Sequence, residues 1–181
     1  MPIGGRITFQ ELHHTRAFRQ RFISALSDPI SSLAICSPFF DRFPKPFENV
    51  VGFCRHLQVR GTEQIQVITR PPGCDKSAMS VEVARELASL GVELFIRSQP
   101  YHHAKMYHFE YLKGYFRSFV GSANFTMGGF ERNYELVAEM EGVGNASPCH
   151  RELKRMQETG GALSYHAWVA RGQPAGDEEQ P

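Results

Sequence analysis

Three short segments in the second half of the chain carry the side chains best suited to chemistry. They are His103-x-Lys105, the GSAN segment at 121–124, and Asn133-x-Glu135, and each lies on an expected β-strand or at its end. Side chains two positions apart on a strand point to the same face, so each segment can present its polar pair together. Three neighbouring strands could therefore bring these groups to one place.

This set of side chains suits phosphoryl transfer. An imidazole can attack phosphorus, while a lysine and an asparagine hold the non-bridging oxygens as charge shifts in the transition state. A carboxylate can orient the imidazole through its other ring nitrogen, and Glu135 is the candidate for that role. No second carboxylate and no cysteine cluster stands nearby in the sequence, so the lysine would do the electrostatic work that a metal does elsewhere. We therefore expect neither a metal nor a cofactor.

The stretch HAKMYHFE, followed by VGSANFTMGGFERNYEL, resembles the single-motif, nuclease-like branch of the phospholipase D superfamily. Members of that branch have an HxK segment followed by GSxN and a downstream Glu. The resemblance covers roughly residues 31–141, and the SPFF segment at 37–40 matches a common early strand. The spacing of all three segments makes the match far more specific than HxK alone.

The resemblance implies a covalent phosphohistidine intermediate, two imidazoles per active site, no metal requirement, and a mixed sheet flanked by helices. It implies that His103 is the nucleophile, that Lys105 and Asn124 bind phosphate, that Ser122 assists, and that Glu135 orients the histidine. The chain has one such set, so we expect a second copy to supply the second imidazole, in a homodimer.

The sequence departs from the family motif at one position, where Glu110 replaces an Asp. The connection from there to GSxN is also longer than in the shortest members. On a regular strand, position 110 faces away from positions 103 and 105, so Glu110 is expected to support the structure instead of binding phosphate. A degenerate copy without activity is the alternative.

Hydrophobic periodicity predicts the elements that must position these groups. Helical spacing predicts helices over residues 9–26, 47–58, 77–90 and 148–159, with Ser77 or Ser80 as the cap of the third. Apolar or alternating runs predict strands over residues 31–40, 64–69, 92–96, 104–111, 115–120 and 134–140. The strand–helix alternation of the first half and the short connections of the second predict an α/β fold with a mixed β-sheet flanked by helices. By the resemblance, this is one phospholipase D-like half that pairs with its copy.

Composition limits the class of protein. At 181 residues and 41% hydrophobic, the chain is long enough for one core. We expect a single phospholipase D-like domain over residues 1–170 and a disordered tail over 171–181, which is rich in Pro, Gly and acidic residues. Four dispersed cysteines fit reduced thiols and no zinc site. Without a signal region or an apolar stretch of about 18 residues, a cytoplasmic protein with no membrane partner is expected.

Several of these residues have a second interpretation. Glu135 could pair with a basic residue across strands, Asn124 could shape the turn before the Gly128-Gly129 pair, and the histidines other than His103 are expected to be structural. The phenylalanines near residues 39, 40 and 125 could stack on bases, although core packing explains most of them. Residues 1–70 hold nine Lys and Arg and five acids, which suits a phosphate-facing surface or a solvated helix face.

The function expected from this sequence is a nuclease that acts on DNA or RNA. The net charge of +1 gives no global attraction to nucleic acid, and the chain is short for a separate sequence-reading domain. Specificity could then come from a partner protein. The alternatives are a non-catalytic nucleic-acid-binding or scaffold subunit, and a lipid phosphodiesterase, which would need an interfacial apolar surface that the sequence does not reveal.

Overall fold

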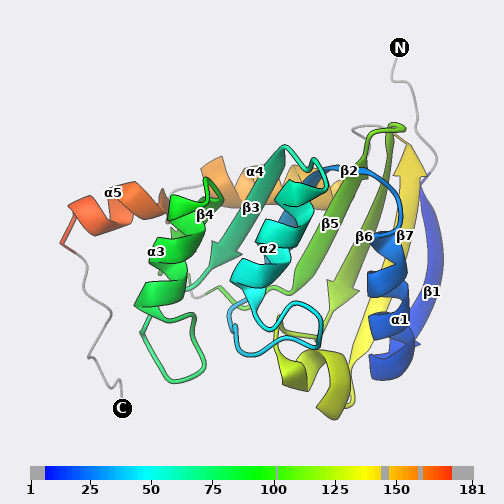
Figure 1. The fold of residues 1–181 in the computed structure, drawn as a ribbon, viewed down its shortest axis with the longest axis horizontal. Helices are drawn as coiled ribbons and strands as arrows, with labels where there is room; N and C mark the ends of the chain where they lie inside the picture. Colours follow the sequence, from blue (N-terminus) through cyan, green and yellow to red (C-terminus); the bar gives the residue numbers. More distant parts are fainter. Residues whose placement is uncertain (1–6, 101, 144–146, 159–160, 173–181) are drawn as a thin grey trace.

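The computed structural model describes residues 7–100, 102–143, 147–158 and 161–172, and its centre is an eight-stranded sheet with the order β1-β7-β6-β5-β2-β3-β4-β8 (Figure 1). β2, β3 and β4 are parallel to one another, and every other neighbouring pair is antiparallel. The predicted mixed sheet is therefore confirmed. The strands are β1 (Thr8–His14), β2 (Ile30–Cys36), β3 (Gln64–Thr69), β4 (Glu93–Arg97), β5 (Met106–Tyr111), β6 (Tyr115–Gly121), β7 (Leu136–Val143) and β8 (Ala162–Ser164).

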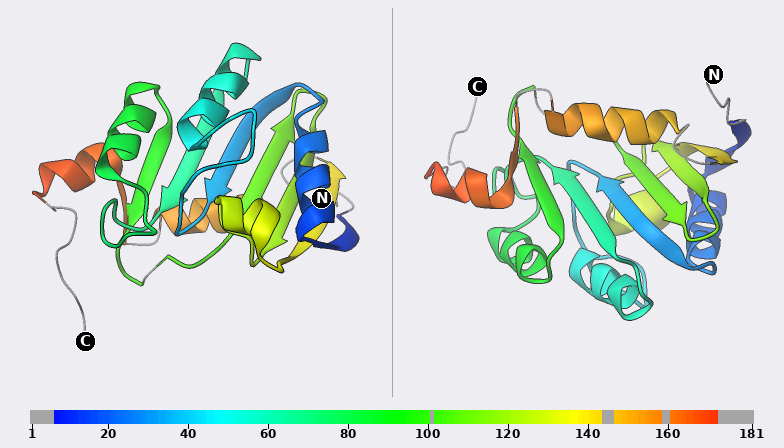
Figure 2. Two further views of the ribbon diagram at one scale, coloured as in Figure 1. Left: turned by 60° about the horizontal axis from the view of Figure 1, so that its bottom comes forward. Right: turned by 90° about the horizontal axis from the view of Figure 1, so that it is seen from above.

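Helices cover both faces of this sheet (Figure 2). One face is covered by α1 (Thr15–Ala25), α2 (Val50–Val59) and α3 (Val81–Ser89), and the other by α4 (Pro148–Glu158). The short helix α5 (Tyr165–Ala170) packs beside β4 and β8, and a π-helical turn, η1 (Gly128–Arg132), precedes β7. Of the two predicted caps for α3, Ser80 is the cap, since its side chain accepts a hydrogen bond from the Val83 backbone.

The larger hydrophobic core lies between the sheet and helices α1–α3 and is rich in aromatic rings. Phe18 and Phe22 of α1 pack against Tyr107 of β5 and Phe130 of η1. Phe40 and Phe125 are also buried in this core, so core packing is confirmed for these two. A smaller cluster lies beneath α4, formed by Ala34, Cys36, Ile68, Met106, Cys149, Leu153 and Met156. Packing in these two cores fixes the strands next to which His103, Ser122 and Glu135 lie.

The predicted helix over residues 9–26 is wrong in its first third, because residues Thr8–His14 form the edge strand β1. Phe9 and Leu12 stand three positions apart, which suits a helix, but the segment pairs antiparallel with β7 more than 120 residues away. A bulge between Phe9 and Glu11 interrupts strict alternation, and alternation is the pattern by which a strand is recognised.

Three short elements were not predicted: η1, β8 and α5. Each is short enough that periodicity is a weak signal. The expected disordered tail at 171–181 lies outside the described residues except for its first two positions. Within the described ranges, no helix is long and apolar enough to span a membrane.

Candidate active site

The three segments that carry His103, Ser122 and Glu135 meet at one edge of the sheet, the edge that is formed by the ends of the strands. β5 begins where β6 ends and β7 begins, as the pairs Met106–Val120 and Gly121–Val137 show. The carboxyl ends of the parallel strands reach the same edge, because Cys36 at the end of β2 is paired with Met106. Ligands of open α/β sheets bind outside the carboxyl ends of such strands. The predicted convergence of three neighbouring strands is what the topology shows.

His103 and Lys105 are brought together immediately before β5. The Lys105 ammonium nitrogen lies 2.9 Å from Nδ1 and 3.3 Å from Nε2 of the His103 ring. The imidazole is exposed, whereas Lys105 is buried, and burial lowers the pKa of its amine while the nearby Glu135 carboxylate raises it. Both residues line a pocket of about 350 Å³, to which α4 contributes Glu152 and Met156.

Ser122 and Glu135 form a second cluster across the ends of β6 and β7. The Ser122 hydroxyl donates a hydrogen bond to the Glu135 carboxylate, and Asn133 Nδ2 donates to the other carboxylate oxygen at 3.1 Å. Thr15, the first residue of α1, fixes this segment, because its hydroxyl bonds the backbone of both Asn133 (2.5 Å) and Glu135 (2.9 Å). These bonds hold the carboxylate against Ser122, so the role of orienting His103 stays a prediction for Glu135.

Asn124 lines a neighbouring hollow. Its Oδ1 atom is buried and has no hydrogen-bond partner among the described residues, and the hollow of about 480 Å³ is also lined by Asn133, Lys76 and Arg132. An unsatisfied buried amide oxygen is costly and calls for a partner. The structure therefore brings His103 with Lys105, and Ser122 with Glu135, and it places Asn124 one step further along the same edge.

Two glycines allow the chain to pass closely through this edge. A Cβ on Gly121 would lie 2.1 Å from the Leu136 carbonyl oxygen, and one on Gly129 would lie 2.2 Å from the Asn124 carbonyl oxygen. A side chain at position 121 would push the segment that carries Ser122 away from β7, and a side chain at position 129 would push η1 away from the Asn124 backbone.

Phe39 and Arg70 belong to this site, and Arg70 was not among the predicted site residues. The Phe39 ring, which is partly exposed, lies edge-on to the His103 ring with 6.3 Å between the ring centroids, and the Arg70 guanidinium carbon lies over the Phe39 ring at 5.1 Å from its centroid. Arg70 directly follows β3, so its place after a parallel strand was the available signal. Its guanidinium also pairs with Asp75 at 2.9 Å.

Part of the basic character of residues 1–70 is compensated by ion pairs. Arg19 pairs with Glu131, Arg21 with Glu139, and Arg55 with Glu86. This arrangement favours the interpretation as ordinary surface and core pairing over a continuous phosphate-facing surface.

Glu110 lies on the α4 face of the sheet, where it bonds Ser32, His108 and His150. Its bonds agree with the expected structural role.

His102, the neighbour of His103 in the sequence, is buried, and its pKa is lowered to about 4 by burial and by the nearby Arg97 and Lys105. It is therefore neutral near pH 7. Across the described residues, the group of His, Cys, Asp and Glu side chains that could hold a metal is His108, Glu110 and His150, outside the pocket of His103.

The chain is similar to known proteins in sequence and in fold. A family model described as "Cardiolipin synthase, PLD-like domain" matches residues 22–157. Nuc from Salmonella typhimurium, described as a phospholipase D family member, has a similar structure with a TM-score of 0.61 and 18% identity, covering 88% of this chain and 99% of that one.

Two further solved structures are similar. NucT from Helicobacter pylori has a TM-score of 0.53 and 14% identity, covering 88% of this chain and 100% of that one. Phosphatidylserine synthase from Haemophilus influenzae has a TM-score of 0.59 and 10% identity, covering 94% of this chain but 42% of that one. No curated protein sequence matches the chain.

Proposed function

Because the chain belongs to the phospholipase D superfamily, we propose that it is a metal-independent phosphodiesterase that cleaves DNA or RNA through a phosphohistidine intermediate. The observation that carries this proposal is the 2.9 Å approach of Lys105 Nζ to His103 Nδ1, at the sheet edge where Ser122 and Glu135 also lie. An imidazole beside a fixed cation is what nucleophilic attack on a phosphodiester requires.

In the proposed reaction, a ring nitrogen of His103 attacks phosphorus and the P–O bond to the leaving oxygen breaks. A phosphate oxygen at this point would replace the ring nitrogen as the acceptor of the Lys105 ammonium proton, which frees the imidazole for attack. Lys105 and Asn124, whose Nδ2 can donate, would hold the non-bridging oxygens. Water then attacks the phosphohistidine and gives its proton to the group that protonated the leaving oxygen, and the P–N bond breaks to regenerate the histidine.

The leaving oxygen needs a proton, and we assign its donor to His103 of a second copy. The adjacent His102 is buried with a pKa of about 4, so near neutral pH it is a neutral imidazole and a poor general acid. Three exposed apolar side chains lie beside the site: Leu12, Val120 and Leu136. Leu12 of β1 and Val120 of β6 are both paired with Ala138 of β7, which lies between them. A two-fold dimer that buries this surface would bring two His103 side chains into one site.

Nucleic acid is the favoured substrate class, because the chain is similar in length to Nuc and NucT. The chain aligns with nearly all of Nuc and of NucT, but with less than half of the phosphatidylserine synthase. A nucleic acid could also stack a base on the partly exposed Phe39 ring next to His103. These features support a nuclease, with any sequence preference supplied by a partner protein.

A lipid phosphodiester is the second candidate. The exposed Val120 and Leu136 beside the pocket, together with the similarity to a phosphatidylserine synthase, favour it over a purely scaffolding role. The same apolar side chains serve either a second copy or an acyl chain, so the substrate assay must include both chemistries.

The decisive experiment incubates the purified chain with labelled single- and double-stranded DNA and RNA, and with phospholipid vesicles, in excess chelator. We expect cleavage of at least one nucleic acid, no lipid turnover, and no activity in His103→Ala. Lipid cleavage alone would make the second candidate correct. Nucleic-acid binding that survives His103→Ala, without any cleavage by the wild-type chain, would establish the non-catalytic alternative.

A further inference from the structure

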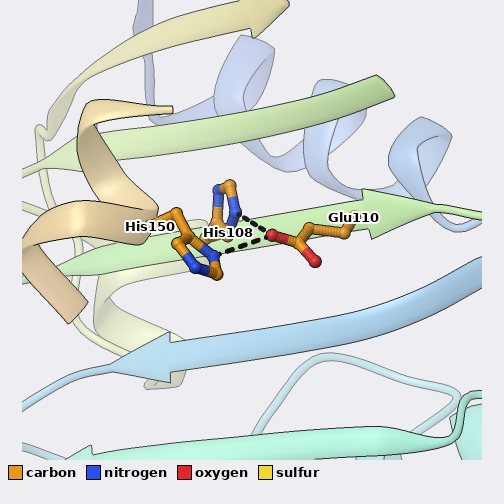
Figure 3. Close-up of side chains that lie close together, drawn as sticks. All are labelled: His108, Glu110 and His150. Atoms are coloured by element: carbon orange, nitrogen blue, oxygen red, sulfur yellow. Dashed lines mark hydrogen bonds and ion pairs between the residues drawn. The ribbon is translucent and has the colours of Figure 1, made fainter. Parts of the chain in front are cut away.

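A second cluster of polar side chains lies away from His103, between β5 and α4 (Figure 3). Oε1 of Glu110 lies 3.1 Å from Nε2 of His108 and 2.9 Å from Nδ1 of His150. The three atoms all lie within 4.8 Å of one another. In a tetrahedral zinc site with bonds of about 2.1 Å, ligand atoms stand about 3.4 Å apart, so only a small outward movement would admit an ion.

The remaining atoms of these side chains are bonded in the manner of metal ligands. The other ring nitrogen of His108, Nδ1, lies 2.8 Å from the Ser118 hydroxyl, and Oε2 of Glu110 accepts from the Ser32 hydroxyl at 2.9 Å. Metal-bound histidines and carboxylates characteristically have such outer partners, which fix their orientation. A serine hydroxyl can donate or accept, so Ser118 accommodates the His108 tautomer whose Nε2 lone pair faces the cluster.

The cluster also has room and access. It lines a pocket of about 320 Å³, in which Gln64 and Gln66 offer further polar groups. His108 is 2% exposed and fixed in the sheet, whereas the His150 side chain is 44% exposed and gives a path from solvent. Two imidazoles and one carboxylate with space for a water is a donor set suited to zinc and similar divalent ions.

We propose that His108, Glu110 and His150 bind one divalent ion of the zinc class. The ion would join β5 to the first turn of α4. The ligands from these two elements, Glu110 and His150, are 40 residues apart in the sequence. The same helix supplies Glu152 and Met156 to the pocket of His103, so the ion would fix one wall of that pocket. Its role is structural and does not depend on the proposed function.

The test uses untagged, chelator-treated protein, to which zinc is added before dialysis. We expect elemental analysis to find one zinc per chain, and the Tm to rise by about 5–10 °C at a zinc concentration a hundredfold above Kd. Cobalt should give the d–d absorption of a tetrahedral ion without a thiolate charge-transfer band, which distinguishes this cluster from the half-buried Cys74.

Two variants and one control assign the ion to these residues. His150→Ala and Glu110→Gln should each weaken zinc binding at least about tenfold, while His166→Ala, which removes an exposed histidine on α5, should bind as the wild type does. Because His150 is nearly half exposed, its variant should fold, and circular dichroism checks this. Equal zinc affinity in His150→Ala, or no zinc retained by the wild type, would overturn the proposal. Metal content and Tm are the readouts, so the result stands apart from any cleavage assay.

Discussion

The hydroxyl of Tyr107 donates a hydrogen bond to the backbone carbonyl of Ala123 at 2.8 Å. Tyr107 lies on β5, two positions after Lys105, and Ala123 lies between Ser122 and Asn124. The bond therefore joins the strand next to the proposed nucleophile to the turn that presents the proposed phosphate-binding groups. Both partners are buried, so the bond is shielded from water.

We expect Tyr107→Phe to lower the free energy of unfolding by about 0.5–1.5 kcal/mol and to lower kcat as well, because the Ala123 turn loses its tie to β5. Tyr111→Phe is a matched control: its hydroxyl donates to Ala25 at 3.0 Å, on α1. The control should lose similar stability and keep its kcat. Urea denaturation and turnover measured on the same preparations give the comparison, and an equal loss of kcat in both variants would count against a positioning role for Tyr107.

His103→Ala should abolish turnover while folding and weak nucleic-acid binding persist, because the exposed imidazole contributes little to the core. Lys105→Ala should reduce kcat at least about a hundredfold, the scale for losing one charge partner of the transition state. Lys113→Ala, on an exposed turn near Asp28, is the control and should cleave normally. Near-normal rates in either site variant would place the chemistry elsewhere.

Subunit mixing tests the shared site. If a fixed amount of wild-type chain is refolded with a ninefold excess of His103→Ala chain, random pairing leaves about a tenth of wild-type chains with a wild-type partner. Activity should fall to about that fraction, because general acid catalysis is worth about a hundredfold to ten-thousandfold. Activity that stays near its starting value would mean that each chain carries a complete site.

Acid should destabilise the fold through Glu139, which lies wholly buried and bonded to Arg21 and His13. Burial raises the pKa of this carboxyl, but the hydrogen bonds from Arg21 and His13 and the nearby charges outweigh burial, so its pKa is lowered overall. A lowered folded-state pKa contributes stability that is fully present above the unfolded value of about 4.3 and is lost as pH falls below it.

Glu139→Gln should therefore lower the unfolding free energy at pH 7 by about 1.5–3 kcal/mol and flatten its fall below about pH 4.5. Glu93→Gln, at an exposed carboxylate bonded to Gln64 and Gln66, is the control and should leave that pH dependence unchanged. Urea titrations from pH 3 to 8 measure both. An unaltered acid slope in Glu139→Gln would assign acid sensitivity to other carboxylates.

The sequence by itself predicted the elements whose patterns are local. β3 (Gln64–Thr69) lies where its alternation placed it, and α3 begins after Ser80, because side-chain periodicity and capping depend on neighbours a few residues apart. The spacing of His103, Lys105 and Ser122 likewise predicted that these side chains gather at one edge of the sheet, since strand parity and short antiparallel connections leave few ways to arrange three consecutive strands.

Tertiary structure decided what depends on residues far apart in the chain. Thr8–His14 is a strand only because β7 lies beside it, and the carboxylate of Glu135 faces Ser122 because Thr15 of α1 holds its backbone. His150 meets Glu110 only when α4 folds back across the sheet. Propensity and periodicity carry no information about such pairings, because their energies arise from contacts that form when distant segments pack together.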